Sequence, residues 1–151
     1  MQKATGQQIW GPPLWLFIHT ICERIDEDYH RENNKMVIEK ICELLRNVPC
    51  PICSKHVNSY LKRYNLHNIK TKQQLITFFF HFHNSVNKRN GKKIFTKEEL
   101  KIYKTLNIAK IYPYVKFSYT KQYYNKTNFN GWRRKQILKN FIKWINTVPF
   151  H

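Results

Sequence analysis

Glycine, cysteine and acidic residues are all scarce in this chain of 151 residues, which holds four glycines, four cysteines and nine carboxylates. So few glycines exclude collagen-like and glycine-rich repeats. Long apolar runs are also missing: Leu75–Phe80 is the longest and contains a threonine, whereas a membrane-spanning helix needs roughly 18 apolar residues. The N-terminus lacks the apolar segment of a secretory signal, so we expect a cytoplasmic protein, in which thiols are normally reduced.

The composition is nevertheless that of a folded domain. Hydrophobic residues make up 42% of the chain and aromatic residues 15%, which is enough to build a core. The length suits a single domain with an appendage.

Charge is unevenly distributed along the chain, whose formal net charge is +18. The carboxylates lie within residues 23–43 and at Glu98 and Glu99, whereas eleven Lys and Arg and no acid lie from Lys101 to Lys143. Such a segment could attract a polyanion: nucleic acid, anionic lipid or an acidic partner. The other interpretation is that these lysines solvate an ordinary surface in a chain biased towards Lys and Asn.

Apolar residues recur at helical spacing through most of the chain, so we expect an all-α protein. The first helix is predicted over 11–28, with Pro12 and Pro13 in its first turn. Others are predicted over 34–47, 50–64, 71–90 and 96–107, and the last two begin with capping boxes, Thr71 with Gln74 and Thr96 with Glu99. Four to five helices joined by short connections indicate a compact helical bundle.

The C-terminal region is expected to differ from this bundle. Residues 112–128 hold five tyrosines and a proline, which predicts extended or irregular chain. One further, basic helix is predicted after Gly131, with an apolar side formed by Trp132, Ile137, Leu138, Phe141 and Ile145. We place a boundary near residue 108, with a domain over 1–108 and a basic, aromatic-rich extension over 109–151. We expect the extension to dock on the bundle through this apolar side and to extend a dimer or client surface.

The segment NVPCPICSKH holds the residues best suited to chemistry. Pro49 and Pro51 flank Cys50, which predicts Cys50 at the N-cap and Pro51 at the first position of a helix. A helix N-terminus carries a partial positive charge, which stabilises a thiolate, and C-x-x-C spacing lets Cys50 and Cys53 form a reversible disulfide. A redox pair, a zinc site and a structural pair all remain open on this motif alone. Zinc would need Cys50, Cys53, His56 and either His81 or His83 as ligands, and no second pair with the usual spacing is present.

Two other polar groups lie on helix faces. His83, Asn84 and Asn87 share one side of the predicted fourth helix, with basic residues after them. They could bind a flat, hydrogen-bonding ligand whose phosphates the lysines neutralise, or they could be an ordinary solvent-facing or capping cluster. Trp15 and His19 lie on one face of the first helix and, with Trp10, could form an aromatic wall or simply belong to the core.

Three motifs, taken together and in this order, resemble those of the Erv/ALR family of FAD-linked sulfhydryl oxidases, in particular the compact members encoded by large DNA viruses. They are W-G-P-x-x-W-x-x-x-H from Trp10 to His19, C-x-x-C-x-x-H from Cys50 to His56, and H-N-x-V-N-x-R-x-x-K from His83 to Lys92. The similarity covers roughly residues 8–107 and therefore excludes the basic extension.

The resemblance implies a four-helix bundle plus a short fifth helix that holds FAD. It also implies a flavoenzyme that forms disulfide bonds in protein clients and passes the electrons through FAD to oxygen, giving hydrogen peroxide. Cys50 would exchange with the incoming thiol, and Cys53 would lie next to the flavin. His83, Asn84 and Asn87 would hold the adenine and ribose, Lys92 would lie near the diphosphate, and no metal is implied. The cofactor contacts carried over are Trp10, Gly11, Pro12, Trp15, His19, His56, His83, Asn84, Val86, Asn87, Arg89 and Lys92.

The resemblance also sets expectations for partners. Clients would be protein dithiols, such as a thioredoxin-like or small C-x-x-C carrier, and a homodimer is implied. A viral member would act in the host cytoplasm or virus factory, or in virion assembly. The first nine residues and the extension hold no cysteine, so a shuttle cysteine pair on a flexible arm is not expected. Cys22 and Cys42 could pair with each other, but we expect buried free thiols.

Two alternative functions remain from the sequence. One is a zinc-stabilised basic module that binds nucleic acid through its extension. The other is an inactive, family-like scaffold in a virion.

Overall fold

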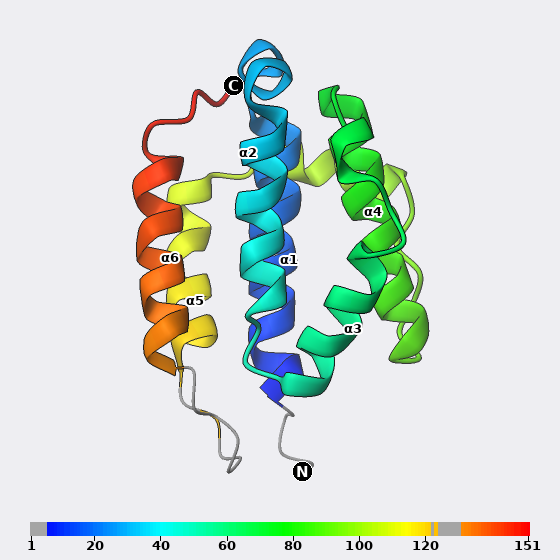
Figure 1. Ribbon diagram of the computed structural model, residues 1–151, viewed down its shortest axis with the longest axis vertical. Coiled ribbons are helices and arrows are strands. Elements are labelled where there is room, and N and C mark those ends of the chain that lie inside the picture. Colours follow the sequence, from blue (N-terminus) through cyan, green and yellow to red (C-terminus); the bar gives the residue numbers. More distant parts are fainter. Residues whose placement is uncertain (1–5, 122, 124–130) are drawn as a thin grey trace.

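Helices form the whole fold in the computed structural model, which describes residues 6–121, 123 and 131–151 (Figure 1). Within these residues, the β contact is limited to one isolated bridge between Ile25 and Phe150. The elements in chain order are α1 (Gly6–Arg24), α2 (Glu27–Arg46), α3 (Pro51–Leu61), the 3₁₀ helix η1 (Leu66–Asn68), α4 (Lys72–Arg89), the 3₁₀ helix η2 (Glu98–Lys104), α5 (Ile108–Thr120) and α6 (Gly131–Ile145). The predicted all-α class is confirmed.

The helix α1 lies at the centre of the molecule. Figure 1 shows α1 and α2 in the middle, α3 and α4 on one side, and α5 and α6 on the other. Contacts with α4, η2 and α5 cover α1 on several sides, so its apolar residues Phe17, Ile18 and Ile21 are fully buried. A helix with apolar residues around most of its circumference is typical of the centre of a core.

The helix bounds depart from the predictions at several ends. α1 begins at Gly6 and ends at Arg24, so Pro12 and Pro13 lie inside it and not in its first turn. The prediction for α2 missed its first part, because Glu27–Asn33 is polar and gives no apolar periodicity. α3 ends at Leu61, three residues before the predicted end. The predicted fifth helix is a 3₁₀ helix, η2.

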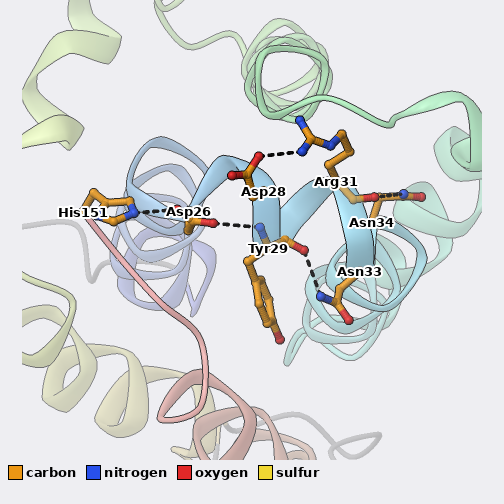
Figure 2. Close-up of polar contacts among 7 residues, drawn as sticks. All are labelled: Asp26, Asp28, Tyr29, Arg31, Asn33, Asn34 and His151. Carbon is orange, nitrogen blue, oxygen red and sulfur yellow. Dashed lines mark hydrogen bonds and ion pairs between the residues drawn. The ribbon is translucent and has the colours of Figure 1, made fainter.

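Hydrogen bonds of side chains stabilise the start of α2, as Figure 2 shows. Asp26 is the N-cap, and its carboxylate accepts a hydrogen bond of 2.7 Å from the Tyr29 N–H. The same carboxylate lies 2.5 Å from the His151 ring, so the last residue of the chain is tied to this cap. Asn33 has a non-helical backbone, and its side-chain amide donates to the Tyr29 carbonyl over 2.9 Å, which holds the chain across this kink.

The C-terminal extension contains two helices, not the single helix that was predicted. The prediction of irregular chain from residue 112 is wrong as far as Thr120, because α5 continues through Pro113; of the remainder, residues 122 and 124–128 lie outside the described residues. The buried side of α5 includes Ile111, Val115 and Tyr119, which recur every four residues, and Ser118 is buried beside them. The Tyr119 hydroxyl donates to the Leu44 carbonyl of α2 over 2.8 Å.

The helix α6 confirms that the extension docks on the bundle. Phe141 packs against Phe17 of α1, with ring centroids 5.7 Å apart, and the Trp144 indole N–H donates to the Tyr29 hydroxyl over 3.2 Å. Trp132, predicted on the apolar side, is instead 75% exposed. Trp132 lies nine residues before Phe141, about two and a half helical turns, which places it on the opposite side of α6.

Cys22 and Cys42 are free and buried, as expected. Burial raises the pKa of the Cys42 thiol to about 12 and also raises that of Cys22. Neither thiol is therefore suited to redox exchange near neutral pH.

Candidate functional site

The redox-capable cysteines lie at the start of α3. Cys50 is the N-cap with an extended backbone, Pro51 follows as the first helical residue, and the Cys50 sulfur accepts a hydrogen bond of 3.2 Å from the Cys53 N–H. The predicted positions of Cys50 and Pro51 are confirmed. Cys50 and Cys53 form a disulfide with their Cα atoms 5.2 Å apart. Ser54 donates from its hydroxyl to the Arg46 carbonyl, which fixes this turn to the end of α2.

A cavity of about 780 Å³ adjoins this disulfide. Cys53 lines the cavity, but Cys50 does not. The walls come from α1, the end of α2, α3, α4 and the segment from η2 into α5, so five parts of the chain meet here. Ligand pockets typically measure roughly 300–1,000 Å³, so this cavity can hold a large organic ligand.

Stacked rings form one part of the cavity wall. Trp15 and His83 stack with centroids 4.3 Å apart and planes 8° apart, and Tyr60 and Phe82 stack at 4.2 Å and 7°. Flat apolar surfaces of this kind suit a planar aromatic ligand.

A pair of histidines supports the stacked rings. His19 Nε2 and His83 Nδ1 lie 2.9 Å apart and share one hydrogen bond. Burial is the main cause that lowers the pKa of His83 to about 4, and the charge of Lys92 is the second. Burial is also the main cause that lowers the pKa of His19 to about 3, and His83 is the second. Both rings are therefore neutral near pH 7 and add no charge to the cavity.

The structure brings most of the predicted site residues together around this cavity. Ten of the twelve predicted cofactor contacts line it: Trp10, Gly11, Pro12, Trp15, His56, His83, Val86, Asn87, Arg89 and Lys92. His19 lies behind the wall, 1% exposed, where it holds His83. Asn84 also lies outside the lining, because its amide exchanges two hydrogen bonds of 2.8 Å with the Phe95 backbone and fixes the loop after α4.

Several lining residues were not predicted. Five of them lie outside the three sequence motifs, namely Tyr60, Phe82, Tyr103, Lys110 and Tyr114. The last two lie on α5, in the segment predicted to be irregular or separate from the domain.

Comparison with known proteins supplies the family. A family model described as Erv1 / Alr family matches residues 12–105. The chain belongs to the Erv1/Alr family. It is 30% identical to an FAD-linked sulfhydryl oxidase of African swine fever virus over 107 residues. This alignment covers 71% of this chain and 89% of the viral protein. It is 31% identical to the FAD-linked sulfhydryl oxidase ERV1 of Arabidopsis thaliana over 101 residues. This alignment covers 65% of this chain and 52% of the plant protein. No solved structure matches the chain significantly.

The cavity of this Erv1/Alr member fits FAD. The Trp10 indole N–H is buried and has no hydrogen-bond partner among the described residues, so it is a donor for which a ligand atom can supply the acceptor. The stacked rings suit the flavin and adenine rings. Arg89 and Lys92 line the cavity and suit a diphosphate.

Two absences among the described residues bear on metal binding and on membrane insertion. Over the ranges that the structure describes, no three His, Cys, Asp or Glu side chains come together to hold a metal ion, so no set of zinc ligands is found there. No helix of that part of the chain is long and apolar enough to cross a membrane.

Proposed function

We propose that this chain is an FAD-linked sulfhydryl oxidase that forms disulfide bonds in protein clients. The overall reaction converts two thiols and one O₂ into one disulfide and one H₂O₂. Membership of the Erv1/Alr family supports the activity. The observation that carries the proposal is that one sulfur of the Cys50–Cys53 disulfide, that of Cys53, lines a cavity that fits FAD.

The position of each cysteine supports a division of roles. Cys50 lies outside the cavity lining and is partly exposed, so a client thiolate attacks its sulfur and forms a mixed disulfide. The bond between Cys50 and Cys53 breaks, and Cys53 leaves as a thiolate at the positive N-terminus of α3. A second client thiolate then attacks the client sulfur of the mixed disulfide. It releases the oxidised client and leaves Cys50 and Cys53 reduced.

The remaining residues bind and orient the cofactor. Bound FAD supplies a two-electron acceptor for the reduced cysteines and a donor that reduces O₂ to H₂O₂. Trp15 and His83 present a flat surface to its rings, and Arg89 and Lys92 neutralise its phosphates. His19 positions the His83 ring, and Asn84 positions the loop after α4, so we assign these two residues supporting roles and not direct contacts.

Partners, compartment and domain division belong to this proposal as well. We propose protein dithiols as clients, a homodimer, and action in the cytoplasm of an infected cell or in virion assembly; the similarity to oxidases of African swine fever virus supports a viral setting. The division into a domain over 1–108 and an extension over 109–151 is supported by the end of the family match at residue 105.

Light scattering on the purified chain tests the homodimer. We expect the mass of a dimer, and a monomer mass would contradict this part of the proposal.

The oxidase activity has a stoichiometry that can be measured. We expect the full chain, purified with FAD, to consume one O₂ and to produce one H₂O₂ for each disulfide formed in dithiothreitol or in a reduced, unfolded protein. Catalase should halve the net consumption of O₂, because it returns half of the oxygen in the peroxide. A chain that binds FAD but consumes no O₂ with either thiol would contradict the activity and favour an inactive scaffold.

A further inference from the structure

The cavity extends beyond the part of the chain that matches the family. The family match ends at residue 105. Five lining residues follow it: Leu106, Asn107, Lys110, Ile111 and Tyr114. All five lie in the segment that leads into α5 or on α5 itself. The extension therefore forms part of the cavity wall.

The wall that α5 forms is firmly attached to the bundle. Val115 and Tyr119 are fully buried, and the Tyr119 hydroxyl bonds to the Leu44 carbonyl of α2. At the other end of the helix, the Arg24 guanidinium of α1 donates to the Leu106 carbonyl over 2.7 Å. Lys110 and Tyr114 thus have a fixed position relative to the cavity, as the residues on α1 and α4 do.

The positive charges at the cavity favour an anionic ligand. Arg89, Lys92 and Lys110 line it, and no carboxylate does so in the described part of the chain. None of these three cations forms an ion pair with a carboxylate of the described residues. His83 adds no charge near pH 7, because burial lowers its pKa to about 4. Unpaired cations that converge on one cavity repel each other until an anion joins them.

The first turn of α5 adds to this preference. Asn107 is its N-cap and Lys110 lies in its first turn, and both line the cavity. A helix N-terminus carries roughly half a positive charge, so a lysine there is unfavourable unless an anion is close. The buried Trp10 N–H, which has no partner among the described residues, is an independent sign that a ligand completes this cavity.

We propose that α5 is part of the FAD site: Lys110 binds the cofactor diphosphate together with Arg89 and Lys92, and Tyr114 packs against the cofactor. This inference rests on the proposed function. Tyr114 lines the cavity although its side chain is 70% exposed, so a bound cofactor would cover part of its ring. The extension is then a component of the cofactor site and not an appendage to a complete enzyme.

Each of the two residues has a matched control on the same helix. Lys116 is exposed like Lys110 but lies outside the lining, and Phe117 is 67% exposed, close to the 70% of Tyr114, and also lies outside it. Substitutions at these four surface positions are expected to leave the melting temperature nearly unchanged, which keeps binding separate from folding.

The test measures the dissociation constant of FAD with the full chain stripped of flavin, by quenching of flavin fluorescence. We expect Lys110→Gln to weaken FAD binding about tenfold or more, because it removes a charged partner of the diphosphate. Tyr114→Ala should weaken it several-fold, whereas Lys116→Gln and Phe117→Ala should bind FAD as the unmodified chain does. Riboflavin, which has no phosphate, should bind to Lys110→Gln and to the unmodified chain with equal affinity.

The outcomes separate this inference from the proposed function. If the unmodified chain binds FAD and both Lys110→Gln and Tyr114→Ala match their controls, the role of α5 is overturned while the oxidase proposal stands. If Lys110→Gln weakens riboflavin binding as much as FAD binding, the contact with the diphosphate is overturned. If the unmodified chain binds no FAD, both proposals fail.

Discussion

Cys53→Ser is expected to reduce thiol-dependent O₂ consumption by roughly 100-fold or more while leaving FAD bound. Serine has nearly the shape of cysteine, and Cys53 is one residue among many in the cavity wall, so the affinity for FAD should change little. A serine at this position cannot form the disulfide with Cys50 that the client thiol attacks. O₂ consumption with dithiothreitol and the FAD content of the purified variant are the two measurements.

Cys42→Ala serves as the control for this substitution. Cys42 is free, is buried in α2 and has a pKa raised to about 12, so it takes no part in the exchange. The variant should keep the turnover of the unmodified chain. Full activity in Cys53→Ser, or an equal loss in Cys42→Ala, would contradict the roles assigned to the cysteines.

Phe141→Ala is expected to lower the free energy of unfolding by about 3–5 kcal/mol, the usual cost of removing a buried phenylalanine side chain. Phe141 is 2% exposed and packs against Phe17 of α1 and Trp144 of α6. Its removal leaves a cavity where the extension meets the bundle. Unfolding in urea, followed by circular dichroism, gives the free energy.

Trp132→Ala is the matched control, because it also removes an aromatic ring from α6. Trp132 is 75% exposed, so its loss should change the free energy of unfolding by no more than about 0.5 kcal/mol. Equal and small effects of the two substitutions would show that α6 contributes little to the stability of the bundle. They would contradict the docking of the extension.

The site was predictable where local chemistry dictates structure. Pro49 and Pro51 around Cys50 leave few backbone choices, and they correctly placed Cys50 at the N-cap of α3. Thr71 and Gln74 likewise form the predicted capping box at the start of α4. Each of these predictions depends on residues only a few positions apart, and tertiary packing does not override them.

Other features depend on packing that one segment cannot reveal. Pro113 and the tyrosines suggested irregular chain, but Ile111, Val115 and Tyr119 bury one face of α5 against α1 and α2, and this burial outweighs the cost of a proline inside the helix. Asn84 belongs to the predicted polar cluster, yet its amide hydrogen-bonds to the backbone of Phe95, eleven residues further along the chain. The place of Lys110 in the cavity wall follows only from how α5 docks, so no motif could indicate it.

The central claim is that a dithiol delivers electrons to FAD through Cys50 and Cys53. The most direct test is an absorbance spectrum of the purified chain with FAD, recorded without oxygen before and after addition of a dithiol, and again after air is admitted. We predict that the visible band of oxidised FAD disappears with the dithiol and returns with air, and that neither change occurs in Cys53→Ser. A chain that holds no FAD, or one whose FAD band the dithiol leaves unchanged, would contradict the account.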